Sequence, residues 1–314
     1  MLEKKIMLVT GGLGFIGKHC VRAALDQGFF VINIDMVSYA ADLKEKKVFE
    51  QHPNYRFIQQ EIQSLEYLPE CDFVFNFAAE SHVDRAISSN KKFCLSNFMG
   101  VQNLLELVSL KQALERPLFL QISTDEVYGD IEHGSHTEDS PLRPSNPYSA
   151  TKAAADLFIQ SFGRTHGIPW RIIRLSNTYG FHQYPEKLIP KSAWRMRRGL
   201  PALMHGDGSY RRAWLHVDDA IDAVFHVALG ATGHTIYNAS GADEVSNIDI
   251  LRMIAHRIGV PQDKAFISVE DRAGQDLRYG MNNSRIAALG WKPKKQLHEE
   301  LPRIVECIEV DRFL

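Results

Sequence analysis

The chain has 314 residues, of which 45% are hydrophobic and 24% charged, the balance of a globular protein with a sizeable core. Its formal net charge is −2, so no global field recruits nucleic acid or an anionic membrane. The N-terminus is too polar for a signal peptide, no stretch approaches the ~20 apolar residues of a membrane span, and the four cysteines form no C-x-x-C pair, so a cytoplasmic protein with reduced thiols and no metal site is expected.

Short apolar runs alternate with longer amphipathic stretches over the first half of the chain. Runs rich in Val, Ile and Phe without polar alternation indicate strands buried on both faces, as in a parallel sheet covered by helices. The predicted strands are residues 6–10, 30–34, 55–59, 72–77, 118–123 and 170–175, and the clearest helices are 15–27, 90–114 and 148–165. This order predicts a doubly wound α/β fold of the Rossmann type.

The rhythm loosens after about residue 180, where loops rich in Gly, Pro and Asp become common. The helices predicted there are residues 186–198, 218–229, 247–258 and 297–310. We therefore expect a dinucleotide-binding domain over 1–180 and a smaller α/β lobe over 181–314 that binds the substrate, with a cleft between them.

A glycine-rich turn follows the first strand in "VTGGLGFIGKH", with Gly11, Gly14 and Gly17 at the start of a helix. Glycine permits the tight turn and lets the backbone approach a pyrophosphate, whose charge then lies at the helix N-terminus. The second strand, "FFVINID", ends in Asp35, 18 residues after Gly17. An acid there accepts hydrogen bonds from the adenosine ribose and repels a 2′-phosphate, which favours NAD(H) over NADP(H).

Two further strands end in residues suited to a ligand site. "FNFAAESHVD" places the small residues Ala78 and Ala79 after the fourth strand, and "STDEVYGD" places Thr124, Asp125 and Glu126 after the fifth. Adjacent carboxylates repel each other and are costly to desolvate, so their position needs a cause. Because parallel strands end at the same edge of the sheet, both segments point at the cofactor crevice.

The helix that follows carries Tyr148 and Lys152 in "NPYSATKAAAD", four residues apart on one face. A nearby ammonium favours a phenolate, so Lys152 is expected to lower the pKa of Tyr148 and make it a base. With the glycine turn, the acidic ribose anchor and the hydroxyl at the end of strand five, this pair resembles the extended short-chain dehydrogenase/reductase (SDR) superfamily.

The four motifs "STDEVYG", "AAESHVD", "NPYSATK" and "YPEKLIP" resemble more narrowly the dTDP-glucose 4,6-dehydratases, over residues 5 to about 310. An epimerase of the superfamily needs no paired acids. The resemblance implies that Tyr148 removes the C4 hydroxyl proton while NAD⁺ takes the C4 hydride, and that Thr124 binds the C4 oxygen. Glu126 then removes the C5 proton, protonated Asp125 assists the departure of the C6 hydroxyl, and the hydride returns to C6.

The resemblance also implies the binding residues and a homodimer formed by helices 90–114 and 148–165. The expected cofactor-binding residues are Gly11, Gly14, Phe15, Ile16, Gly17, Asp35, Ile62, Ala78, Ala79, Asn97, Tyr148 and Lys152. The expected substrate-binding residues are Ser81, Thr124, Asn177, Glu186, Lys187, His205, Arg212, Asn238 and Arg272. "SYRRAW" leaves open whether Arg211 or Arg212 holds the diphosphate.

Some alternatives remain at this point. His205 replaces the usual tyrosine and Gln275 the usual histidine of the dTDP-glucose enzymes, and histidine at the first position is typical of enzymes acting on UDP-glucose. UDP-glucuronate decarboxylases and GDP-mannose dehydratases carry T-S-E instead of T-D-E, and the latter use NADP, against Asp35. A protein that kept the fold without catalysis would not be expected to keep Thr124, the acid pair, Tyr148 and Lys152 together.

Overall fold

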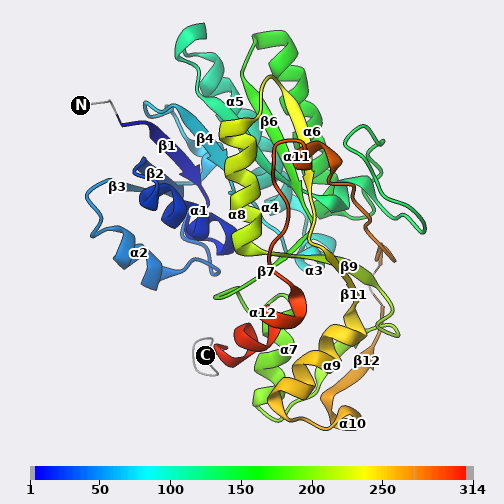
Figure 1. Ribbon diagram of the computed structural model, residues 1–314. Helices are drawn as coiled ribbons and strands as arrows, with labels where there is room; N and C mark the ends of the chain where they lie inside the picture. Colours follow the sequence, from blue (N-terminus) through cyan, green and yellow to red (C-terminus); the bar gives the residue numbers. More distant parts are fainter. Residues whose placement is uncertain (1–3, 272, 309–314) are drawn as a thin grey trace.

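The computed structural model describes residues 4–271 and 273–308, and its larger lobe is built on a seven-stranded parallel sheet (Figure 1). The strands lie in the order β3–β2–β1–β4–β5–β6–β10. Their bounds are β1 (Ile6–Thr10), β2 (Phe30–Asp35), β3 (Tyr55–Gln59), β4 (Phe73–Asn76), β5 (Leu118–Thr124), β6 (Trp170–Leu175) and β10 (Thr235–Ala239). This is the doubly wound fold expected from the sequence.

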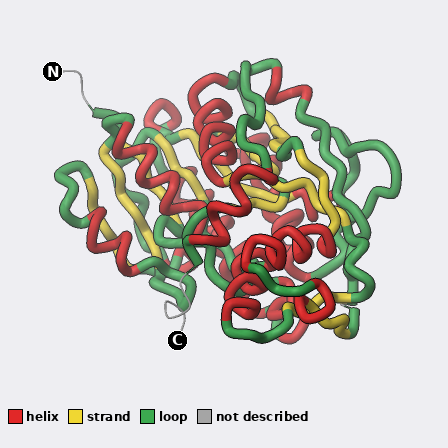
Figure 2. The backbone as a smooth tube through the Cα atoms, turned by 60° about the horizontal axis from the view of Figure 1, so that its bottom comes forward, coloured by secondary structure: helices red, strands yellow, loops and turns green. Residues whose placement is uncertain are grey.

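Helices cover both faces of this sheet, and Figure 2 shows its strands between them. The helices of this lobe are α1 (Phe15–Asp26), α2 (Leu43–Phe49), α3 (Val83–Ser88), α4 (Lys91–Phe93), α5 (Gly100–Ser109), α6 (Pro147–His166), α8 (Val217–Phe225) and α11 (Ser284–Ala287). Met7 and Val9 of β1 pack in one apolar cluster with α1 and α8, whereas Leu8 packs in a second cluster with α5 and α6. Alternate residues thus face opposite helical layers, which explains why the strand has no polar alternation.

The strand order reverses between β1 and β4, with β2 on one side and β5 on the other. The loops that follow β1 and β4 diverge there and leave a crevice at the carboxyl edge of the sheet, where open α/β folds bind ligands. The glycine turn, Ala78–Ala79 and the acid pair all follow strands at this edge. The fold therefore gathers the three motifs that the sequence separates by more than 100 residues.

The smaller lobe contains two small sheets and three main helices. Its strands are β7 (Asn177–Tyr179), β9 (Arg211–His216) and β11 (Asp243–Ser246) in one sheet, and β8 (Ala202–His205) and β12 (Phe266–Val269) in the other. Its helices are α7 (Leu188–Arg197), α9 (Asn247–Ile258), α10 (Gln262–Ala265) and α12 (Leu297–Glu306). Residues of α7, α9 and α12 share one apolar core that is separate from the two clusters of the large sheet.

The chain returns to the large sheet after residue 180. Strand β10 pairs with β6, α8 packs on α1, and Trp291 is buried in the same cluster as β1. The division of the chain at residue 180 stays a prediction, but the second half contributes to both lobes. The chain therefore passes between the two lobes more than once, so more than one segment connects them.

The predicted helix over 90–114 is interrupted in the structure. It consists of α4, a π-helical turn over Cys94–Met99, α5, and a separate 3-10 turn over Ala113–Glu115. Asn97 lies in the π turn, buried, and exchanges hydrogen bonds with the backbone of Glu80 at 2.8 and 2.9 Å. π turns are common at functional sites, and this one fixes the loop after β4. Three further 3-10 or π turns in the described part of the chain cover 62–64, 125–128 and 226–230.

Candidate active site

A cavity of about 420 Å³ opens at the carboxyl edge of the large sheet, and residues of both lobes line it. A smaller cavity of about 100 Å³ adjoins it beside β2 and shares the wall formed by Gly11, Gly14 and Ala79. The larger cavity suits a polar ligand of substantial size, and the smaller one extends it towards Asp35 and Ile62.

The glycine turn forms one end of this cavity and has no room for side chains. Gly11 adopts a φ of 68°, and a Cβ there would lie 2.7 Å from the backbone of Ala78. A Cβ on Gly17 would lie 2.1 Å from the carbonyl oxygen of Gly11. Gly14 is the N-cap of α1 and offers no capping side chain, so the first turn of the helix, with Phe15 and Ile16, faces the cavity. This bare helix N-terminus fits a pyrophosphate.

Asp35 ends β2 at the wall of the smaller cavity, together with Ile62, Ala78 and Ala79. Its Oδ2 accepts from Leu13 N at 3.0 Å and its Oδ1 from Val37 N at 2.8 Å. Burial raises the pKa of Asp35, against the effect of these two hydrogen bonds. The carboxylate oxygens keep accepting capacity for ribose hydroxyls. The donor set and the cavity therefore fit the adenosine end of NAD.

Asn97, which the resemblance assigns to the cofactor, lies behind the cavity wall instead of in it. In addition to its bonds with Glu80, its Nδ2 donates to Thr151 Oγ1 of α6 at 3.0 Å. Glu80 itself lines both cavities. Asn97 thus connects the loop after β4 to α6 and supports the cofactor site from outside.

The acid pair begins a 3-10 turn over Asp125–Tyr128, directly after β5. Thr124 Oγ1 lies 3.1 Å from Asp125 Oδ1 and accepts from Glu126 N at 3.3 Å. Asp125 is 2% exposed, and within the described residues its Oδ2 is buried without a hydrogen-bond partner. Asn146 Nδ2 donates to Glu126 Oε2 at 3.1 Å. Two neighbouring carboxyls thus lie in different hydrogen-bonding environments.

These environments affect protonation. Burial, and then the charge of Glu126, raise the pKa of Asp125 to about 7, although the Thr124 hydroxyl opposes this. Burial also raises the pKa of Glu126, but the hydrogen bond from Asn146 and the charges of Arg212 and Lys187 oppose the rise. Because close carboxyls resist double ionisation, the arrangement favours a protonated Asp125 beside an ionised Glu126.

Tyr148 and Lys152 lie one turn apart on α6 and both line the cavity. Asn146 is the N-cap of this helix and forms a capping box with Ser149, and Pro147 follows it, so the helix start is well defined. Lys152 Nζ donates to Ile122 O of β5 at 2.6 Å. Helix α6 is therefore fixed against the strand that carries the acid pair.

The protonation of Tyr148 differs from the expectation. Burial raises its pKa first, the charges of Glu126 and Asp125 raise it further, and a hydrogen bond with Thr124 opposes the rise. Burial also lowers the pKa of Lys152 to about 8, while Asp156 opposes this. The sequence predicted a lowered pKa for the phenol. In this structure burial of the phenol is the main cause of its raised pKa, and the charges of the nearby acid pair add to it.

Most of the expected substrate-binding residues line the cavity. Lining residues from that prediction are Ser81, Thr124, Asn177, Glu186, Lys187, His205 and Arg212. Lys187 Nζ donates to Ser81 O at 2.6 Å, and Tyr39 OH donates to Glu186 Oε2 at 2.7 Å. His205 Nδ1 lies 3.0 Å from Glu270 O. Arg272 lies outside the described residues.

Asn238 is not part of the cavity lining. It is fully buried in β10, where its Oδ1 accepts from Tyr128 OH at 2.8 Å and its Nδ2 donates to His136 O at 3.3 Å. Its backbone N donates to Glu138 Oε1 at 3.0 Å. These contacts hold the turn behind the acid pair and give Asn238 a supporting position, while its assignment to the nucleoside stays a prediction.

Arg212 faces the cavity, and backbone carbonyls fix its guanidinium. It donates to Asp276 O at 2.8 Å and to Leu277 O at 3.2 Å, and its Cζ lies 4.3 Å from the ring centroid of Tyr279. Gln275 and Tyr279 of the same segment also line the cavity. The segment over residues 273–279 therefore forms part of the wall and holds the arginine in place.

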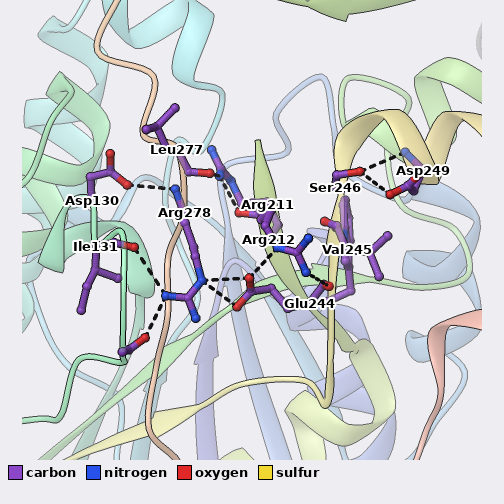
Figure 3. A network of polar contacts seen from close by, with 12 residues as sticks. Asp130, Ile131, Arg211, Arg212, Glu244, Val245, Ser246, Asp249, Leu277 and Arg278 are labelled. Carbon is purple, nitrogen blue, oxygen red and sulfur yellow. Dashed lines mark hydrogen bonds and ion pairs between the residues drawn. The ribbon is translucent and has the colours of Figure 1, made fainter. Parts of the chain in front are cut away.

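Arg211, the alternative to Arg212, does not line the cavity and belongs instead to a polar network with Glu244 and Arg278 (Figure 3). Its Nε donates to Glu244 Oε1 at 2.8 Å, and Arg278 Nε donates to the same oxygen at 2.8 Å. Arg278 N also donates to Asp130 Oδ1 at 2.9 Å, in the loop that follows the acid pair. This network joins β9, β11 and the 273–279 segment, which keeps Arg212 oriented towards the cavity.

Two residues of the site escaped the sequence prediction. Asn146 had a visible signal, since Asn-Pro before an apolar helix is typical of an N-cap, but its bond to Glu126 depends on tertiary structure. Tyr39 lies in an irregular loop after Asp35 and had no signal.

Within the described residues, no cluster of three or more His, Cys, Asp or Glu side chains is arranged to bind a metal ion, and no helix has the length and apolarity to cross a bilayer.

Comparison with known proteins places this site in a family. A family model described as GDP-mannose 4,6 dehydratase matches residues 8–304. The chain belongs to this family. Among its relatives, the low-salt glycan biosynthesis protein Agl12 of Haloferax volcanii is 41% identical to it over 96% of this chain and 97% of the relative's own length.

Two further similar proteins are both dTDP-glucose 4,6-dehydratases. The dTDP-glucose 4,6-dehydratase of Streptomyces niveus is 38% identical over 98% of this chain and 93% of its own length. The crystal structure of DesIV, the dTDP-glucose 4,6-dehydratase of Streptomyces venezuelae with NAD and TYD bound, is similar with a TM-score of 0.92 at 35% identity and covers 98% of each chain. The extended SDR fold expected from the motifs is confirmed.

Proposed function

We propose that this chain is an NAD-dependent nucleotide-sugar 4,6-dehydratase that converts dTDP-glucose to dTDP-4-keto-6-deoxyglucose. The observation that carries this proposal is the neighbouring pair Asp125–Glu126, which lines the cavity with Thr124, Tyr148 and Lys152 and whose two carboxyls have different hydrogen-bond partners. An oxidoreductase or epimerase that uses the tyrosine and lysine needs no such pair. A hydro-lyase needs both an acid and a base.

The glycine turn, Asp35 and Ala78–Ala79 fit NAD at the sheet edge. The N-terminus of α1, which has no capping side chain, would bind the pyrophosphate. Asp35 would accept hydrogen bonds from the ribose hydroxyls and repel a 2′-phosphate. The chemistry that NAD supplies when bound is reversible hydride transfer. The protein supplies orientation and protons around it.

The first proton step belongs to Tyr148. Acting as a phenolate beside Thr124, it takes the C4 hydroxyl proton as C4 is oxidised to the ketone, and Lys152, one turn away on the same helix, stabilises the phenolate charge. Carboxylate charge near Tyr148 opposes this step because it raises the phenol's pKa. A protonated Asp125 therefore serves two purposes: it reduces the negative charge beside Tyr148 and it stores the proton for the next step.

The elimination belongs to the acid pair. The 4-keto group acidifies C5–H, and the ionised Glu126 removes that proton. Asp125 gives its proton to the C6 hydroxyl, which leaves as water. Glu126 returns its proton to C5 when C6 is reduced, and the proton taken by Tyr148 replaces the one that Asp125 gave up. The product is one water molecule and a 4-keto-6-deoxy sugar, with both acids restored.

UDP-glucose is the second candidate substrate. His205 and Gln275 both line the cavity, and these are the two positions at which the sequence departs from the dTDP-glucose pattern. Purified protein should be incubated separately with dTDP-glucose and UDP-glucose, and the rates of 4-keto sugar formation compared, with Tyr148→Phe as the inactive control. Formation of a 4-keto product that keeps its C6 hydroxyl, or of a 4-epimer, would contradict the dehydratase assignment.

We also propose that the protein is a homodimer. Leu95 and Met99 of the π turn and Leu157 of α6 are 38%, 42% and 57% exposed, and they lie on the two helical segments expected to pair with a second copy. Phe98 and Phe158 lie beside them with ring centroids 5.3 Å apart. Pairing these faces in a four-helix interface would bury this apolar surface.

A cytoplasmic location is the last part of the proposal. Cys20, Cys71, Cys94 and Cys307 are all free thiols, which supports a reducing compartment. Fractionation of the source cells, with the protein detected by antibody, tests it.

A further inference from the structure

Two loops from different parts of the chain meet at the mouth of the cavity. One covers residues 36–42 after β2, and the other covers residues 180–187 between β7 and α7. Tyr39 OH donates to Glu186 Oε2 at 2.7 Å, and the rings of Tyr39 and Tyr184 meet edge to face at 5.4 Å. All three residues line the cavity. The contact therefore joins the cofactor side of the site to the substrate side.

A third element holds the Tyr39 ring in place. The guanidinium of Arg85, on α3, lies 3.9 Å from the centroid of that ring. An arginine over an aromatic face adds about 0.5–1 kcal/mol at an exposed site. Tyr39 is 43% exposed, yet Arg85 and Tyr184 contact its ring and Glu186 its hydroxyl. A tyrosine in a mobile loop would not have partners on two other segments of the chain, here α3 and the 180–187 loop.

The loops are anchored below this contact as well. Lys18 of α1 is 5% exposed, and its Nζ donates to Asp42 Oδ2 at 2.8 Å and to His182 O at 3.1 Å. Asp42 ends the first loop and His182 lies in the second, so one buried ammonium joins both. The distance between the loops is thereby fixed from within the protein.

The backbone of both loops is strained. Val37 and His182 have φ values of 62° and 63°, and they are the non-glycine residues with positive φ in the described part of the chain. A β-branched residue in this region is costly and persists only where its surroundings impose it. Each strained residue lies within four positions of Tyr39 or Glu186. Both loops thus adopt an unfavourable backbone conformation close to the two side chains that meet.

We propose that Tyr39 is a positioning residue for substrate binding: through its hydrogen bond it holds the Glu186 carboxylate against the hydroxyl groups of the sugar. This rests on the proposed function and on the sequence-based expectation that Glu186, which lines the cavity, binds the substrate. A carboxylate has two oxygens and several lone pairs, so one bond from Tyr39 leaves accepting capacity for the substrate. Without that bond, Glu186 would have to be ordered by the substrate itself.

The proposal separates binding from chemistry. Tyr39 has no contact with Asp125, Glu126 or Tyr148 among the bonds and ring contacts described, so its hydroxyl does not touch the reacting groups. An interaction made equally with substrate and transition state changes KM and leaves kcat alone. Loss of the Tyr39 hydroxyl should therefore raise KM without lowering kcat.

The test uses Tyr39→Phe, which keeps the ring contacts and removes the hydroxyl, with Glu186→Ala and the double variant. Tyr67→Phe, at a tyrosine that is 60% exposed, is the matched control. Steady-state kinetics with the accepted nucleotide-glucose should give a KM about 10-fold higher for Tyr39→Phe at unchanged kcat, because the variant loses a hydrogen bond to a charged group. Bound NAD(H) and the Tm should match wild type.

The double-mutant cycle decides whether Tyr39 acts through Glu186. The effect of Tyr39→Phe on KM should disappear in the Glu186→Ala background, because the carboxylate that it positions is gone. Full additivity of the two substitutions, a KM for Tyr39→Phe within twofold of wild type or below it, or loss of bound NAD(H) would each overturn the proposal. Wild-type enzyme in the same assay separates these outcomes from failure of the dehydratase assignment, which would leave wild type without 4-keto product.

Discussion

Asn146 bonds to Glu126 and caps helix α6 with the same side chain. Its Nδ2 donates to Glu126 Oε2 at 3.1 Å, while its Oδ1 accepts from Ser149 N at 3.0 Å in the first turn of the helix. Tyr148 is two residues further along. One amide therefore holds both Glu126, the proposed base of the elimination, and the start of the helix that carries Tyr148, the proposed base of the oxidation.

Asn146→Asp should separate the two roles of this side chain. Aspartate is as good an N-cap as asparagine, so α6 should keep its start. The substitution removes the donor to Glu126 and adds a negative charge beside it, and both changes raise the pKa of Glu126. Because Glu126 must be ionised to act as a base, the acidic limb of the kcat–pH profile should move to higher pH by about 1 unit. An acidic limb at the same pH as in wild type would show that the hydrogen bond from Asn146 does not determine the pKa of Glu126.

Asp125→Asn tests the raised pKa through stability. The folded pKa of Asp125, about 7, lies above the unfolded value of about 3.9, so the folded state binds the extra proton. The stability that this carboxyl contributes is complete below pH ~3.9 and is lost as pH rises to about 7. Asparagine does not titrate, so the variant's free energy of unfolding should gain on wild type by about 2–3 kcal/mol between about pH 5 and about pH 8.

Urea unfolding of both proteins at the two pH values measures this gain. The buried amide of asparagine lowers the variant's stability at both pH values and cancels in the comparison. If the difference between variant and wild type is the same at both, Asp125 is ionised in the folded protein at neutral pH and does not store a proton for the C6 hydroxyl.

Six of the seven strands of the large sheet were predicted, because most of them are rich in apolar residues, whereas the seventh, β10 (Thr235–Ala239), was missed. Strands β1, β3 and β6 have the bounds expected from sequence, and β2, β4 and β5 differ by a residue or two. The strands of the smaller lobe were missed. Strand β9, for example, mixes two arginines with a tryptophan and a histidine, and its pairing with β7 and β11 depends on contacts distant in sequence.

The site was predictable where a motif carries the chemistry at fixed spacing. The glycine turn, the acid pair and Tyr148–Lys152 line the cavity as expected, because strand ends and one helix face position them. Asn97 and Asn238 were placed by resemblance alone, and in the structure both hold neighbouring segments from behind the wall. Sequence patterns report which residues recur but not whether a buried amide bonds to a ligand or to the backbone.

Leu157→Arg tests the homodimer. Leu157 is 57% exposed on α6, so arginine at this position should be tolerated by the isolated fold. An arginine in the centre of an apolar interface would be buried without a partner, which costs several kcal/mol per subunit. Sedimentation analysis should give a dimer for wild type and a monomer for the variant, with Val48→Arg as the control, at a position on α2 that is equally exposed (57%) and lies outside the proposed interface. A monomeric wild type, or a dimeric Leu157→Arg, would remove the proposed interface.

The division of labour between Tyr148 and the acid pair is tested most directly by rapid mixing of Glu126→Gln with substrate. Tyr148 and Lys152 are intact in this variant, so oxidation at C4 should proceed, while loss of the positioned base should slow the elimination by about 10²–10⁴-fold. The absorbance of reduced nicotinamide should therefore rise and persist, with almost no 4-keto-6-deoxy product, whereas Tyr148→Phe should show neither. Normal product formation by Glu126→Gln, or a failure to reduce the cofactor as complete as that of Tyr148→Phe, would contradict the roles assigned to these residues.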